Sequence, residues 1–223
     1  MVSIMINDFL KSRSVEHRYA SYDFCYLYFQ TNRGNLGGDN MENSCMHLWS
    51  YLASWGMLRG SSVLLQRSPA SLKPLIEYFD SICNSVVWVA DVDSYATNKS
   101  EILLAYQNIS KILEQIMNNP DEQKKQTKPS VTLITKIMLG VFGCVPAIDQ
   151  YFFNTFHEAY GGFRTLGDSE LYYLAAFYGD NQEVIDSFLI PVLNFDGTPT
   201  ELYYKKAKLI DMYGFTYGLK HRK

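Results

Sequence analysis

A nearly uninterrupted apolar segment at residues 130–157, SVTLITKIMLGVFGCVPAIDQYFFNTFH, most constrains what this chain can fold into. Its short Gly-Cys-Val-Pro break predicts two buried helices joined by a tight connection. Lys136 lies in the first of these helices, and Asp149 lies at the start of the second. A charged group in apolar surroundings costs free energy unless it caps a helix, pairs with an opposite charge or performs chemistry. We therefore take Asp149 and Lys136 as the candidate catalytic residues.

Apolar residues recur at helical spacing along most of the chain, which predicts an all-α, compact multi-helix fold. The segment 86–95, VVWVADVDSY, is the one plausible strand, although its length also suits a short helix. The predicted helices span 19–31, 41–66, 68–82, 98–117, 130–142, 147–158, 168–179, 181–188 and 200–213.

A polar segment bounded by proline, NNPDEQKKQTKP at 118–129, predicts a linker. It divides the chain into an N-terminal helical lobe, 1–117, and a C-terminal helical lobe, 130–223, which carries the candidate catalytic helix pair. We expect the two lobes to pack closely, with a cleft between them.

Several classes of protein lack support in the sequence. No run reaches the roughly 18 apolar residues of a membrane span, so no membrane partner is expected. Phosphate-loop, dinucleotide-binding and serine-nucleophile motifs are missing, and neither the four histidines nor the four cysteines have metal-ligand spacing. We therefore expect no metal and no cofactor. Dispersed cysteines without a C-x-x-C pair are typical of free thiols in the cytoplasm.

The position of Asp149 at a helix start favours its ionised form, because the helix dipole and free backbone N–H groups stabilise a negative charge there. If the two helices are neighbours across the break, Lys136 and Asp149 face the same cleft. The alternative is purely structural: Asp149 caps its helix, and Lys136 extends its ammonium to solvent.

The segment 135–156, TKIMLGVFGCVPAIDQYFFNTF, resembles the catalytic region of the helix-hairpin-helix DNA glycosylases and the bacterial OGG-fold proteins. In that family a helix bearing a lysine precedes a break rich in Pro and Val, and an Asp opens the next helix. Lys136 and Asp149 match these positions in order and type. The segments YLASWGMLRGSS and TKIMLGVFG also resemble a bacterial protein family. That second resemblance implies no particular activity.

The resemblance implies a DNA glycosylase, a hydrolase that binds double-stranded DNA, flips a damaged or modified base and cuts its N-glycosidic bond. It implies that Asp149 stabilises the cationic sugar and helps activate water, and that a lysine attacks the sugar carbon where present. Here the lysine and the Asp are only thirteen residues apart, and Gly140 and Gly143 follow the lysine instead of preceding it. These departures favour a water-using, monofunctional enzyme in which Lys136 positions a phosphate. Base excision of this kind serves DNA repair or antiviral defence against phage.

The C-terminal region is basic, with six basic against two acidic residues over 200–223. Phosphate contact depends on such local charge more than on the net charge of −3. We expect aromatic rings and cations of this region to bind the substrate; they are Tyr213, Phe215, Tyr217, Lys220, Arg222 and Lys223. The alternative is that the rings pack the final helix onto the core and that the cations are solvated.

A rival hypothesis comes from a different class of protein. The same apolar helices suit a non-enzymatic helical interaction or scaffold protein that binds a protein partner. Asp149 is then a helix cap, and the basic terminus is an ordinary solvated end.

Overall fold

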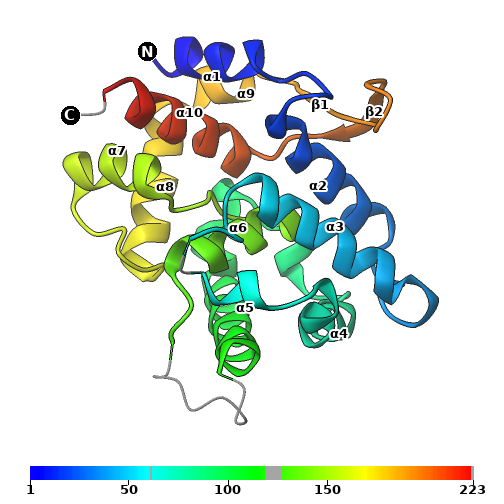
Figure 1. Cartoon of the computed structure of the whole chain (residues 1–223). Helices are drawn as coiled ribbons and strands as arrows, with labels where there is room; N and C mark the ends of the chain where they lie inside the picture. The colour runs from blue at the N-terminus through cyan, green and yellow to red at the C-terminus, as the bar shows by residue number, and fades with distance from the viewer. Residues whose placement is uncertain (61, 119–126, 222–223) are drawn as a thin grey trace.

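The computed structural model describes residues 1–60, 62–118 and 127–221, most of which lie in helices (Figure 1). The prediction of an all-α class is confirmed, with one small pair of antiparallel strands added to it. The helices in these residues are α1 (Val2–Lys11), α2 (Ser21–Thr31), α3 (Met41–Ser54), α4 (Lys73–Ser81), α5 (Tyr95–Met117), α6 (Val131–Phe142), α7 (Gln150–Tyr160), α8 (Asp168–Asp180), α9 (Gln182–Asp186) and α10 (Lys206–Lys220).

Helix α6 lies at the centre of the fold and packs against α2, α3 and α5 (Figure 1). Every residue from Leu133 to Phe142 is buried, as the apolar run predicts. The Ser130 hydroxyl caps the first turn by accepting a hydrogen bond from the Leu133 amide. Gly143 ends the helix in a left-handed conformation, with φ of 65°, and a Cβ there would lie 2.8 Å from the Tyr26 ring.

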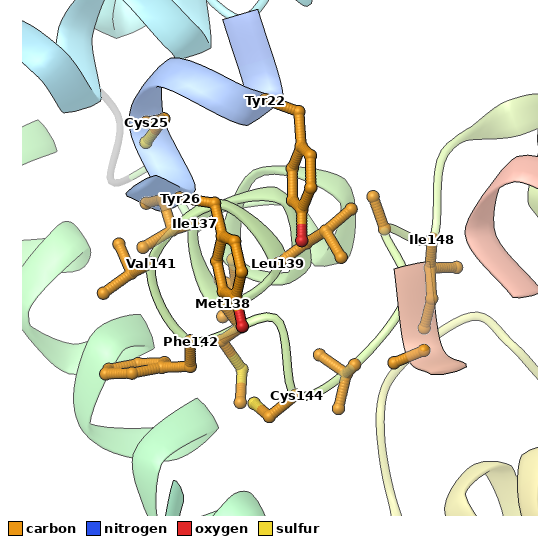
Figure 2. Packing of buried hydrophobic residues seen from close by; sticks show 14 of the residues in the cluster. Tyr22, Cys25, Tyr26, Ile137, Met138, Leu139, Val141, Phe142, Cys144 and Ile148 are labelled. Atoms are coloured by element: carbon orange, nitrogen blue, oxygen red, sulfur yellow. The ribbon is translucent and has the colours of Figure 1, made fainter. Parts of the chain in front are cut away.

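Aromatic residues of α2 cover one side of α6. Figure 2 shows the rings of Tyr22 and Tyr26 side by side above Met138, with Phe142 close by. The two tyrosine rings are stacked at a centroid distance of 5.4 Å, and both residues are almost fully buried. The high aromatic content of the chain is thus used largely to fill the core.

Of the two alternatives for 86–95, the strand is wrong and the short helix is closer to the structure. The chain makes two short 3₁₀ turns there, Val86–Trp88 and Val92–Ser94. A side chain caps the start of each turn. The Ser85 hydroxyl accepts a hydrogen bond from the Val87 amide, and the Asp91 carboxylate accepts one from the Val92 amide. The consecutive residues Val87 and Trp88 are both buried while Val89 is exposed, so burial does not alternate here as it does along a strand.

The predicted helix at 200–213 is wrong in its first half. Residues Pro199–Tyr203 form strand β2, which pairs antiparallel with β1, Pro191–Leu193. Helix α10 begins only at Lys206 and continues to Lys220.

Contacts from distant segments determine where α10 begins. The Asp91 carboxylate accepts hydrogen bonds from the Lys206 and Ala207 amides, at 2.8 and 2.9 Å. The Lys205 ammonium donates to three backbone carbonyls, those of Trp88, Ala90 and Phe142. Burial raises the pKa of Asp91 and lowers that of Lys205, while these hydrogen bonds offset part of the cost of burying the charges.

The predicted helix at 41–66 is shorter than expected. Helix α3 ends at Ser54, and Gly56 follows with φ of 75°, a conformation that interrupts a helix. A separate 3₁₀ turn, Val63–Gln66, covers the end of the predicted segment.

The division into lobes 1–117 and 130–223 stays a prediction. Most of the predicted linker, residues 119–126, lies outside the described residues. The described residues on its two sides pack against each other, since α1 contacts α10, α2 contacts α6 and α5 contacts α8. None of the helices in the described residues has the length and apolarity needed to span a membrane.

Two glycines of α10 allow α7 to approach closely. A Cβ at Gly214 would lie 2.4 Å from the Phe152 ring, and one at Gly218 would lie 2.1 Å from the Tyr151 carbonyl oxygen. Sequence analysis does not reveal this role, because it depends on which faces of the two helices meet. Helices α7 and α10 therefore form one tightly packed pair, and α7 carries Asp149 at its start.

We expect Gly218→Ala to lower the free energy of unfolding by about 2–3 kcal/mol, because a backbone oxygen cannot rotate away from the new methyl group. Denaturant unfolding followed by circular dichroism measures this loss. Gly179→Ala is the control, because Gly179 lies in α8 and nothing is within 4 Å of its Cβ position. Alanine there should raise stability by about 0.5–1 kcal/mol, through its better helix propensity. Equal effects of the two substitutions would contradict the proposed close packing.

Candidate functional site

The segment after α6 turns back along that helix and brings Asp149 next to Lys136. Two threonines of α6 hold the segment at Ile148: the Thr132 hydroxyl donates to the Ile148 carbonyl at 2.7 Å, and the Ile148 amide donates to the Thr135 hydroxyl at 2.9 Å. The Lys136 Nζ lies 3.4 Å from the Asp149 Oδ2. The structure thus brings Lys136 and Asp149 together, whereas the two helices themselves pack mainly on other elements, α6 on α2, α3 and α5, and α7 on α10.

The two oxygens of Asp149 have different partners. Oδ1 accepts hydrogen bonds from the Tyr151 and Phe152 amides, each at 3.0 Å, and so caps α7. Oδ2 faces Lys136. The side chains are 15% exposed for Asp149 and 5% exposed for Lys136, so the pair lies at the edge of the interior. Backbone donors thus hold the carboxylate in position through Oδ1, while Oδ2 interacts with the Lys136 ammonium.

A second buried ion pair lies beside the first, and sequence analysis missed it. The Lys208 Nζ lies 2.7 Å from the Asp211 Oδ2, and both residues are buried. The Asp211 Oδ1 accepts a hydrogen bond from the Ala147 amide at 3.1 Å, which ties α10 to the segment that carries Asp149. The only signal in the sequence is the spacing of Lys208 and Asp211 in an apolar segment.

The indole of Trp55, just beyond the end of α3, joins the two ion pairs. Its ring centroid is 4.6 Å from the Lys136 Nζ and 5.7 Å from the Lys208 Nζ. Phe215 meets the indole edge-on at 5.8 Å. Both lysines lie within the distance at which an ammonium is attracted to an aromatic face. We name Trp55, Lys136, Asp149, Lys208 and Asp211 the Trp55 cluster.

Two buried polar atoms near the Trp55 cluster are unsatisfied. The Trp55 Nε1 and the Tyr22 hydroxyl have no hydrogen-bond partner among the residues that the structure describes. The Tyr22 ring centroid is 4.5 Å from the Lys208 Nζ. Burial of an unpaired donor costs about 1–3 kcal/mol, and such groups in native proteins often mark a functional site.

Tyr51 lies against the same part of α6. Its ring would be 2.5 Å from a Cβ at Gly140, one helical turn after Lys136, so only glycine admits the ring there. Burial raises the pKa of Tyr51 well above its ordinary value, and the negative charges of Asp211 and Asp149 add to this effect. Burial also raises the pKa of Tyr22. Both phenols therefore stay protonated at neutral pH and act only as neutral groups.

The aromatic residues predicted to bind the substrate separate into two groups. Phe215 is buried and contacts Trp55, Phe9, Tyr19 and Tyr151. Tyr213 and Tyr217 are half-buried and pack elsewhere, on Phe177 and His221 respectively. The structure therefore brings only Phe215 of these three to the Trp55 cluster.

The predicted phosphate-binding cations lie at the end of α10 and beyond it. Lys220 is exposed and forms an ion pair with Asp8 of α1. Arg222 and Lys223 lie outside the described residues. The role of this terminus in DNA binding stays a prediction.

Metal-ligating side chains do not gather at the Trp55 cluster. Nowhere in residues 1–60, 62–118 and 127–221 do three or more His, Cys, Asp or Glu side chains form a group able to hold a metal ion. The chemistry available to the cluster itself comes from two carboxylates, two amines and an indole.

Comparisons of this chain with protein-family models, with curated proteins and with solved structures give no match. Any assignment of function therefore rests on the geometry of the Trp55 cluster and on the resemblance of residues 135–156.

Proposed function

We propose that the chain is a DNA glycosylase that flips a damaged or modified base and cuts its N-glycosidic bond at Asp149 and Lys136. The observation that carries this proposal is the Lys136–Asp149 pair, held 3.4 Å apart at the edge of the interior and beside the Trp55 indole. A carboxylate beside an aromatic ring suits the excision of a flipped base, and an amine in the same place can add a nucleophile.

Asp149 supplies the negative charge. As the bond between the base and the sugar breaks, positive charge develops on the sugar ring, and a fixed carboxylate stabilises it. The hydrogen bonds from the Tyr151 and Phe152 amides hold Asp149 in place before the reaction, so little reorganisation is needed. The departing base takes the electron pair of the bond, and an abasic site remains.

Trp55 supplies a stacking surface. Aromatic stacking on a base is worth about 1–3 kcal/mol and does not depend strongly on the identity of the base. Trp55, with Phe215 edge-on beside it, is therefore the best place in the cluster for a flipped base.

The location of Lys136 changes the role that we propose for it. Sequence analysis favoured a lysine that positions a phosphate, but the side chain is 5% exposed and its ammonium faces Asp149. This location suits an amine that attacks the sugar carbon better than one that meets the DNA backbone. In that route the ammonium first gives a proton to water, so that Asp149 stays ionised, and the neutral amine bonds to the sugar C1′ as the base leaves with the bonding electrons and takes up a proton from water. The sugar ring then opens to give a Schiff base with Lys136, and water hydrolyses it to release the abasic site.

Borohydride reduction during turnover tests this route. We expect a covalent protein–DNA adduct with the unsubstituted chain and no adduct with Lys136→Gln, because only an amine forms a reducible Schiff base. Lys99→Gln is the matched control, since Lys99 also pairs with an aspartate, Asp168, but on the surface. Abasic-site formation without any trapped adduct would return Lys136 to a non-covalent role and leave Asp149 with a water nucleophile.

The scaffold hypothesis remains the second candidate function, because the two amide hydrogen bonds of Asp149 are also those of a purely structural cap. Binding to a short DNA duplex at several salt concentrations separates the two. A glycosylase should bind at low salt and lose affinity as salt rises, whereas a scaffold for a protein partner should not bind the duplex.

We place the proposed activity in the cytoplasm, in DNA repair or in defence against phage DNA that carries modified bases. Support for this location comes from the cysteines, which are free in the structure, as expected for thiols in a reducing compartment.

A further inference from the structure

The charges around Trp55 do not balance. Lys136 is paired with Asp149, and Lys208 is paired with Asp211. A third cation, Arg18, has its guanidinium carbon 5.4 Å from the Trp55 ring centroid. Arg18 has no carboxylate partner within the part of the chain that the structure describes, and it is exposed. It is therefore a cation of this region that is free to bind an anion from solution.

The backbone at Arg18 is fixed, while its side chain is held only by aromatic rings. Arg18 begins the 3₁₀ turn Arg18–Ala20, and its carbonyl accepts a hydrogen bond from the Ser21 hydroxyl at 2.7 Å. The next residue, Tyr19, is buried and meets Trp55 edge-on at 5.5 Å. The guanidinium lies over both rings, at 5.4 Å from each centroid. The fold thus sets the distance between the Arg18 guanidinium and Trp55. The guanidinium can turn outward to solvent without breaking a strong bond.

We propose that Arg18 binds the backbone phosphate of the nucleotide whose base stacks on Trp55. This inference rests on the proposed glycosylase function. The planar guanidinium matches the geometry of a phosphate and can bind it through two parallel hydrogen bonds. In the free protein the same group lies over the indole by cation–π attraction, which is weak at an exposed site and easily exchanged for a phosphate.

The test compares Arg18→Gln with Arg33→Gln in salt titrations of duplex binding. Arg33 is the matched control, because it is also exposed and lies over a tryptophan, Trp88, at 5.5 Å, but follows the opposite end of α2. We expect Arg18→Gln to weaken binding on the order of tenfold and to reduce the log–log salt slope by about 0.9. Arg18→Lys should keep the salt slope and lose part of the affinity. Lysine retains the positive charge but cannot bind a phosphate through two parallel hydrogen bonds. Arg33→Gln should match the unsubstituted chain.

The outcomes separate this inference from the proposed function. Equal slopes for Arg18→Gln and Arg33→Gln, with base excision intact, would overturn the role of Arg18 and leave the glycosylase proposal standing. Absence of duplex binding by the unsubstituted chain would overturn both. A lower affinity of Arg18→Gln with an unchanged slope would mark a structural effect and would also overturn the role of Arg18 in phosphate binding. Unfolding curves of each variant confirm that the comparison is made between folded proteins.

Discussion

Asp149→Asn is expected to lower the single-turnover rate of base excision by about 10²–10³-fold or more, while duplex affinity stays within a few-fold of the unsubstituted chain. Asparagine retains the size of the side chain and can still cap α7, because its oxygen can accept from the Tyr151 and Phe152 amides. The negative charge beside the developing cationic sugar is lost, and with it the ion pair to Lys136. Rapid-quench kinetics on an excised substrate and a parallel binding titration measure the two effects.

The control for this prediction is Asp168→Asn. Asp168 lies in the first turn of α8 and pairs with Lys99 at 3.0 Å, but both side chains are more than half exposed. This substitution removes the same charge from the start of a different helix and should leave excision unchanged. If Asp149→Asn lost stability as a core substitution does and kept its excision rate, Asp149 would be a structural cap and the scaffold hypothesis would gain support.

The second large effect concerns a buried network that joins the N-terminal helices to the strand pair. Asp23 of α2 is fully buried and accepts hydrogen bonds from Arg13, from the Leu193 amide at 3.0 Å and from the Tyr204 hydroxyl at 2.7 Å. Asp23→Ala leaves the Arg13 guanidinium, which is 8% exposed, without its carboxylate. We expect a loss of about 3–5 kcal/mol in the free energy of unfolding, as for other broken buried ion pairs.

Chemical denaturation of Asp23→Ala measures this loss, and Asp8→Ala is the control. Asp8 also pairs with cations, Lys11 and Lys220, but these lysines are exposed, and water can replace such contacts. Its removal should change stability little, although the lysines lower the pKa of Asp8 to about 2. Arg13→Met combined with Asp23→Leu should recover only part of the stability, because the apolar pair leaves no unpaired charge but the Leu193 amide and the Tyr204 hydroxyl lose their acceptor. Similar losses for Asp23→Ala and Asp8→Ala would contradict this description of the network.

The sequence predicts the centre of the fold well because its signals there are local. The apolar run at 131–142, the preceding serine and the following glycine determine α6 without help from the rest of the chain. The proximity of Lys136 and Asp149 also follows from local chemistry, since a Gly and a Pro force a turn within a few residues. Local signals also predict a helix start at Asp149, which caps α7, because an aspartate shortly after a proline is typical of a helix start.

The features that sequence analysis missed depend on distant contacts. The start of α10 is set by Asp91, more than a hundred residues earlier in the chain. The inward orientation of Lys208 depends on the rotation of α10, which the Gly214 and Gly218 contacts with α7 determine. The Trp55 cluster forms only when the end of α3, α6, the start of α7 and α10 come together. No periodicity within one segment carries that information.

Direct counting of abasic sites tests the central claim of base excision at Asp149. The unsubstituted chain and Asp149→Asn are incubated with unmodified, damaged and hypermodified duplexes, and abasic sites are labelled with an aldehyde-reactive probe. The account predicts labelled sites in at least one modified duplex with the unsubstituted chain, and a loss of about 10²–10³-fold with Asp149→Asn. Equal labelling by both proteins, or no labelling in any duplex, would contradict it.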